Sequence, residues 1–116
     1  MADPFFESDI VAHCLEDIVS LQTEVLVFSE YGLFASLEDQ KANIKTLRTL
    51  LDKQKNMFFR CMLSKEPSAK ELAKDIIEHF VTMGYDIPEN PMDLFDEMGI
   101  SIDQIEQDLN EYEEFQ

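Results

Sequence analysis

Apolar residues recur at helical spacing through most of the chain. Over about residues 8–31 they alternate at spacings of three and four, which is the pattern of a heptad seam. The seam consists of Val11, Cys14, Ile18, Leu21, Val25 and Phe28, and a second stripe consists of Ile10, Leu15, Val19 and Leu26. This pattern predicts a long helix that contacts more than one neighbour.

A second heptad pattern covers about residues 37–63. Its apolar positions are Leu37, Ile44, Leu47, Leu51, Phe58 and Cys61, with Gln40 and Gln54 at two seam positions. Ser36 is placed to cap the start of this helix, and Gly32 predicts a left-handed end to the helix before it. Because the connection between the two helices is short, we expect an antiparallel hairpin.

The last third of the chain predicts three shorter helices. Pro67 breaks the second long helix, and a third helix follows over about residues 68–83. A fourth helix is expected over about residues 91–98, ended by Gly99, and a fifth over about residues 102–113.

No alternating strand pattern occurs, so we expect one all-α domain over residues 1–116 with a frayed acidic tail from about residue 111.

Charge is strongly segregated along the chain. Residues 1–39 hold nine acids and no Lys or Arg, residues 40–77 hold nine bases and four acids, and residues 78–116 hold twelve acids and no Lys or Arg. The net charge of −16 argues against binding to nucleic-acid phosphates or anionic lipid. It is compatible with binding to basic protein surfaces.

Four cations on one flank of the second helix form what we call the basic stripe: Lys41, Lys45, Arg48 and Lys55. Only Asp52 opposes them along the body of this helix. Asp17 and Glu24 of the first helix lie on the opposite flank in heptad terms. We therefore expect the stripe to pair with the acidic C-terminal helix, with a second chain, or with an external acidic ligand.

A cluster of large apolar residues, Met57, Phe58, Phe59 and Met62, exceeds what one hairpin seam buries. Together with the basic stripe, it forms our candidate partner-binding surface. Homodimerisation is an economical way to bury such an excess, so we expect a homodimer.

Motifs for catalysis are missing from the sequence. There is no glycine-rich phosphate loop and no nucleophile elbow, so we expect neither enzymatic activity nor a cofactor. Asp75 and His79 share a helix face, but two such residues are a weak basis for a metal site, and we expect no metal. Cys14 and Cys61 are expected to be reduced thiols, with a disulfide between them as the alternative.

The N-terminus has neither a basic region nor an apolar one, which argues against a secretory signal. No apolar run reaches the roughly 18 residues of a membrane span. We therefore expect a cytoplasmic protein.

Three segments resemble a known family: FFESDIV at residues 5–11, LLDKQK at 50–55 and LSKEPSAK at 63–70. The chain is similar over roughly residues 5–105 to a small domain-of-unknown-function family that cyanobacteria share with some of their large tailed phages. The resemblance implies a soluble, all-helical, non-catalytic protein. It supplies no catalytic or binding residues.

These observations favour a non-enzymatic protein–protein interaction module, either a regulator or an assembly factor, that acts through an apolar helix face and segregated charge. The alternative is an acidic nucleic-acid mimic that inhibits a DNA-binding enzyme. A metalloenzyme that depends on His79 is a third hypothesis.

Overall fold

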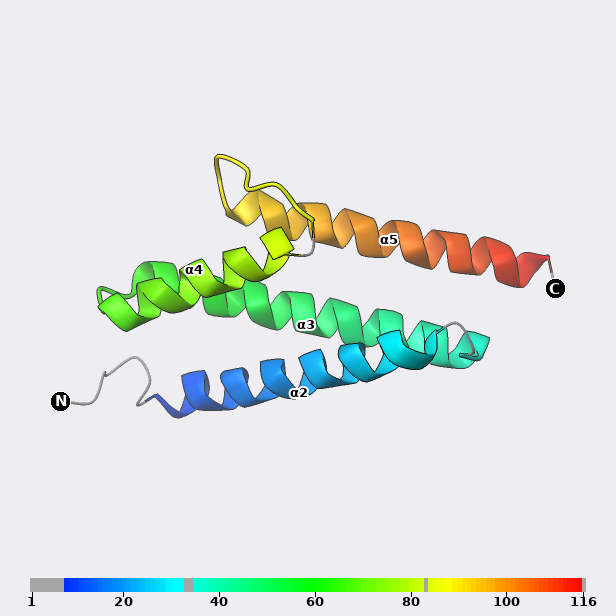
Figure 1. The fold of residues 1–116 in the computed structure, drawn as a ribbon, viewed down its shortest axis with the longest axis horizontal. Coiled ribbons are helices and arrows are strands. Elements are labelled where there is room, and N and C mark those ends of the chain that lie inside the picture. The colour runs from blue at the N-terminus through cyan, green and yellow to red at the C-terminus, as the bar shows by residue number, and fades with distance from the viewer. Residues whose placement is uncertain (1–7, 33–34, 83, 116) are drawn as a thin grey trace.

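The structure is a computed structural model of the 116-residue chain, and it describes residues 8–32, 35–82 and 84–115. These residues form four α-helices and no strand, as Figure 1 shows. The helices are α2 (Asp9–Tyr31), α3 (Leu37–Leu63), α4 (Pro67–Thr82) and α5 (Met92–Glu114). The expectation of an all-α protein is confirmed.

Helix α3 is the axis of the molecule. Each of the other three helices packs against it and runs in the opposite direction (Figure 1). The resulting shape is long, with extents of 58 × 30 × 20 Å. Its radius of gyration of 16.1 Å exceeds the roughly 13 Å expected of a compact domain of this length.

Side-chain caps fix the starts of the two long helices. Ser8 Oγ accepts a hydrogen bond from the backbone N–H of Val11 at 3.5 Å, and Ser36 Oγ accepts one from the N–H of Asp39 at 3.1 Å. The predicted left-handed end at Gly32 is wrong, because Gly32 has a φ of −55°. Gly32 is instead in the right-handed region, and its carbonyl accepts a hydrogen bond of 3.2 Å from Ala35 N–H.

The two short helices predicted over residues 91–98 and 102–113 are in fact one helix, α5, with Gly99 in its interior. Phe95, Ile102 and Leu109, seven residues apart on both sides of Gly99, are all buried. One apolar face therefore runs through the glycine and packs along α3. Burial of these side chains offsets the roughly 1 kcal/mol that glycine costs inside a helix.

Proline and glycine mark the two ends of helix α4. Helix α4 begins at Pro67, where the missing N–H of proline costs nothing because the first helical N–H has no partner in the helix. It is followed by Gly84, whose φ of 98° belongs to the left-handed region. Helix α5 continues to Glu114, so the tail that was expected to fray from about residue 111 is helical as far as that residue.

The core lies where α3, α4 and α5 meet. The ring of Phe95 lies 5.5 Å from that of Phe58 and makes an edge-to-face contact with Phe80 at 5.3 Å. Met57 and Leu94, both fully buried, belong to the same cluster. A smaller cluster of Ile44, Ile102 and Leu109 continues along the contact between α3 and α5.

Replacement of Gly99 by alanine tests whether α5 is continuous. The added methyl group would lie 3.9 Å from Leu51 Cδ2, which is an ordinary contact distance. Since alanine is favoured over glycine inside a helix, we expect Gly99→Ala to raise the free energy of unfolding by roughly 0.5–1 kcal/mol in urea denaturation.

A glycine that ended one helix and preceded another would give the opposite sign, because alanine is strained in the left-handed region. Gly84, with its φ of 98°, is the matched control, and Gly84→Ala should lower the free energy of unfolding. A loss of stability at both positions would contradict the continuous helix.

Candidate interaction groove

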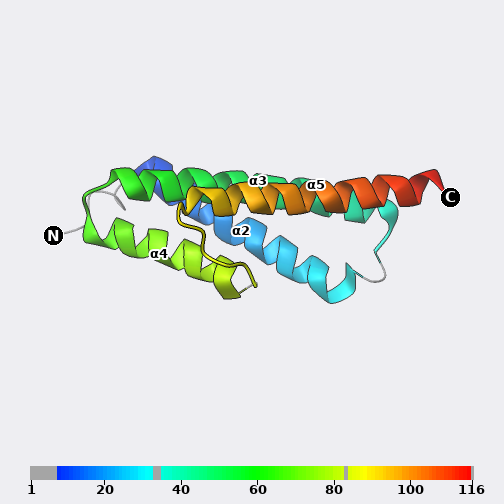
Figure 2. The ribbon, with the colours of Figure 1, turned by 90° about the horizontal axis from the view of Figure 1, so that it is seen from above.

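Helix α4 covers only part of α3. It has 16 residues, whereas α2, α3 and α5 have 23, 27 and 23. At about 1.5 Å per residue, α4 spans about 24 Å beside an α3 of about 40 Å. Figure 2 shows α4 and the C-terminal end of α2 on the same side of α3, with α4 confined to the C-terminal part of α3. The molecule thus resembles a four-helix bundle whose fourth position is only partly filled.

The unfilled part is a groove between α2 and α5, with α3 as its floor. We call it the apolar groove, and it has two parts that follow each other along one face of α3. Its floor includes Ile44, Leu47, Leu50, Leu51 and Gln54, and its walls include Val25 and Leu26 of α2 and Ile102, Ile105 and Leu109 of α5. The deep part has a volume of about 220 Å³ and ends at Phe80 of α4, and the outer part has about 530 Å³.

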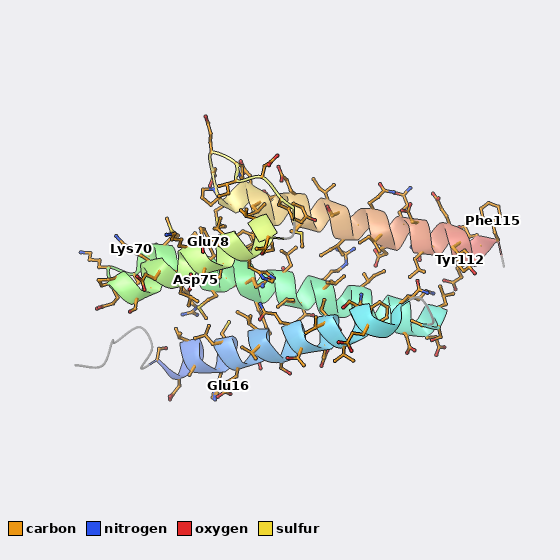
Figure 3. All side chains as sticks on the ribbon, viewed as in Figure 1. Glu16, Lys70, Asp75, Glu78, Tyr112 and Phe115 are labelled. Atoms are coloured by element: carbon orange, nitrogen blue, oxygen red, sulfur yellow. The ribbon has the colours of Figure 1, made fainter. Side chains whose placement is uncertain are left out.

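The ends of the groove can be located by two side chains labelled in Figure 3. Glu78 lies on α4, one helical turn before the end of that helix, and Tyr112 lies near the C-terminal end of α5. Tyr112 lines the outer part of the groove. The groove therefore begins where α4 stops and runs toward the C-terminal end of α5.

The α2 wall shows the effect of the short α4, which leaves part of the fourth position unfilled. The buried residues of α2, Val11 and Ile18, both lie in its first half, where Leu15 and Ile18 line a cavity shared with Leu72 of α4. Beyond Ile18, no residue of α2 with a described side chain is buried. The second half of α2 therefore keeps apolar surface, including Leu26, in contact with solvent.

Gln54 is a polar side chain at the deep end of the groove. The residue is only 4% exposed and its side chain makes no hydrogen bond to another described residue, but its amide keeps contact with solvent, because no fully buried side-chain nitrogen or oxygen of the described residues lacks a partner. Its neighbours along the cavity wall include Gln22 and His79. An apolar group that covered this amide would leave it unsatisfied, which typically costs about 1–3 kcal/mol, so the position favours contact with water or with a polar group of a ligand.

The basic stripe pairs for the most part with α5. Lys41 forms an ion pair with Glu113, and Lys55 Nζ lies 3.9 Å from Asp96 Oδ1. Of the expected alternatives, pairing with the acidic C-terminal helix is the one that the structure shows. Lys45 is exposed and forms no ion pair within the described part of the chain.

Arg48 has the most extensive contacts of the stripe. Its Nη1 lies 2.7 Å from Asp103 Oδ1 and its Nη2 lies 3.1 Å from Glu106 Oε1. The hydrogen bond to Asp103, with the charges of both carboxylates, raises the pKa of the Arg48 guanidinium above its usual value. Arg48 therefore stays charged and holds two successive turns of α5 against α3.

One further pair joins α3 to α2. Lys53 Nζ lies 3.1 Å from Asp17 Oδ2. Lys53 is outside the basic stripe, so Asp17 meets α3 on the flank that the heptad pattern indicated. The outer side of α2 carries further acids, such as Glu16 (Figure 3).

The candidate apolar cluster separates into two groups. Met57 and Phe58 are fully or almost fully buried against α4 and α5, so they are core residues and are not available to a partner in this fold. Phe59 and Met62 are exposed at the end of α3 together with Leu63. We call these three the tip patch. The sequence pattern did not separate the groups because it could not show where α4 and α5 pack.

Both cysteines are free thiols. Cys61 is fully buried, and this burial raises the pKa of its thiol to about 11. It therefore stays protonated at neutral pH. Cys14 is half-buried, with its Sγ 3.9 Å from the Lys53 carbonyl. The alternative of a disulfide between the two is not what the structure shows.

The fold and the groove define a class: an all-helical protein in which three helices pack on a central one and leave an apolar groove open. The particular family follows from comparison of sequences. A family model described as "Domain of unknown function (DUF1825)" matches residues 3–109, and the chain belongs to this family. No curated protein and no solved structure matches the chain.

Neither a metal-binding cluster nor a membrane-spanning helix occurs in residues 8–32, 35–82 and 84–115. Within them, no three His, Cys, Asp or Glu side chains come together in a way that could hold a metal ion. No helix within these ranges is both long and apolar enough to cross a membrane.

Arg48→Glu should lower the free energy of unfolding more than Lys45→Glu. The two substitutions change the net charge equally, but only the first places a carboxylate against Asp103 and Glu106. Because exposed ion pairs contribute about 0.2–1 kcal/mol each, we expect a difference of about 1–2 kcal/mol in urea unfolding at low salt.

The difference should shrink in about 1 M NaCl, where the screening length falls to about 3 Å. Equal destabilisation by the two substitutions would contradict the pairing of the stripe with α5.

Proposed function

We propose that the protein is a non-enzymatic protein–protein interaction module, a regulator or assembly factor that works in the cytoplasm. The observation that carries this proposal is the apolar groove, whose walls expose large side chains such as Leu26 and Ile105. Exposed apolar surface of this kind, rimmed by charge, is typical of surfaces that bind other proteins.

The alternative, an acidic nucleic-acid mimic, receives less support from the geometry. A mimic needs carboxylates spaced along a free surface. Four acids of α5 instead pair with cations of α3: Asp96, Asp103, Glu106 and Glu113. These pairs interrupt the acidic face of α5.

A homodimer is part of the proposal, and we place its contact at the tip patch. Phe59, Met62 and Leu63 are exposed there, and the neighbouring charges have both signs, as with Lys65 and Glu66. Two copies that meet at this end keep most of their acidic surfaces apart. Homodimers commonly bury a patch of this kind on both partners.

Light scattering tests the homodimer. We expect a mass twice the 13.5 kDa of one chain, and a single-chain mass for the Phe59→Glu, Met62→Glu double variant. Both residues are exposed, so the variant should keep the helix content of the wild type in circular dichroism. A single-chain mass for the wild type at high concentration would contradict the dimer.

Affinity capture tests the interaction module itself. Following the resemblance of the sequence, we take cyanobacteria and their tailed phages as the source and expect a stoichiometric partner from cyanobacterial extract. Leu26→Glu with Ile105→Glu should reduce its recovery at least tenfold, because both side chains lie in the groove. Quantitative mass spectrometry measures the recovery.

The matched control is Ile10→Glu with Ile100→Glu. These residues lie on the same two helices outside the groove and are 61% and 69% exposed, compared with 63% and 49% for Leu26 and Ile105. The control adds the same charge and should keep the partner. Equal loss in the two double variants, or capture of no partner at all, would contradict the proposal.

A further inference from the structure

We propose that the apolar groove binds one amphipathic helix of another protein, with basic residues on its flanks and a polar side chain that meets Gln54. This inference rests on the proposed function and names the kind of partner. The floor from Gln40 to Gln54 is about 21 Å long at 1.5 Å per residue, so the bound helix has about four turns.

The shape of the groove favours a helix over a small molecule. Helix α4 already occupies the first part of the same position on α3, with Ala69, Ala73, Ile77 and Phe80 buried. A bound helix would continue along that line and bury the exposed surface of Leu26 and Ile105. The deep part, at about 220 Å³, suits individual side chains of such a helix.

The charges of the walls determine the flanks of the partner. Helices α2 and α5 carry acids and no lysine or arginine. The cations of α3 offset this only in part, because Lys41, Arg48 and Lys55 pair with four of the nine acids of α5. Asp108 lines the outer part of the groove directly. Basic flanks would therefore be attracted and acidic flanks repelled.

A second copy of this chain does not meet these requirements. Its long outer helices, α2 and α5, are as acidic as the walls of the groove, and each copy has a net charge of −16. Its α4 carries Lys70 and Lys74, but the apolar face of α4 is already buried in its own core. The groove is therefore assigned to a different protein.

Gln54 supplies an observation that is independent of charge. Gln54 lines the deep part of the groove, where its amide makes no hydrogen bond to the residues that the structure describes and keeps contact with solvent. A purely apolar helix placed over it would leave the amide unsatisfied. A glutamine, asparagine or serine at the matching position of the partner would satisfy it.

Three synthetic peptides of 18 residues provide the probe. The first has leucines and one central glutamine on one face and lysines on both flanks. The second replaces the lysines by glutamates, and the third replaces the central glutamine by leucine. Fluorescence anisotropy with the full chain should show saturable binding of the first peptide, at least tenfold tighter than that of the second.

The variants of the capture experiment locate the binding. Leu26→Glu with Ile105→Glu adds acids to the rim, so binding by charge alone would strengthen, whereas binding in the groove should weaken at least tenfold. Ile10→Glu with Ile100→Glu should bind like the wild type. Gln54→Leu should reverse the preference for the first peptide over the third.

Three results would overturn the inference. They are an absence of saturable binding of the lysine-flanked peptide, equal binding of the glutamate-flanked peptide, or tighter binding by the Leu26→Glu, Ile105→Glu variant. If the recovery of a partner from extract still depends on Leu26 and Ile105 in that case, the proposed interaction module is supported and only the inferred kind of partner is wrong. A dimer mass that is lost in the groove variant would assign the groove to a second copy and also overturn the inference.

Discussion

The structure depends on the burial of α3 from three sides. Its apolar residues do not form one seam: Met57 and Phe58 are covered by α4 and α5, and Leu50 belongs to the same core as Val11 and Ile18 of α2. Because α2 and α5 lie on different sides of α3, it is contact with α3 that holds the other three helices in one structure. The arrangement also explains the groove, because α4 is too short to cover α3 along its whole length.

The segregated charges favour the packing of α5 on α3 on one side of the molecule and leave a negative electrostatic field on the other. The bases of α3 recur every seven residues and meet acids of the antiparallel α5 at matching heights, from Lys41 with Glu113 to Lys55 with Asp96. Each pair is partly exposed and contributes little alone, but together they favour one register of α5 on α3. The other five acids of α5 form no ion pair with α3, and Asp108 among them lines the groove and contributes negative charge there.

Much of the fold could be predicted from local pattern. The heptad spacing predicted both long helices, and Ser36 marked the start of α3 because a side-chain oxygen there accepts the N–H of Asp39. The prediction failed at Gly99, since a glycine between two apolar segments has the same local sequence in a helix end and in a helix interior. Burial of Phe95 and Ile102 against α3 decided between them, and that contact joins residues far apart in the chain.

The candidate site shows the same division. The sequence by itself determined the helical segments apart from their continuity at Gly99, their apolar faces and the location of every charge, because each of these follows from spacing within a few turns. Only the tertiary structure decided that Phe58 is core while Phe59 is exposed, that Arg48 faces Asp103, and that Gln54 lies beneath an uncovered groove. The reason is that exposure depends on which helix packs over a residue, and here the length of α4, not the residues of α3, sets where that cover ends.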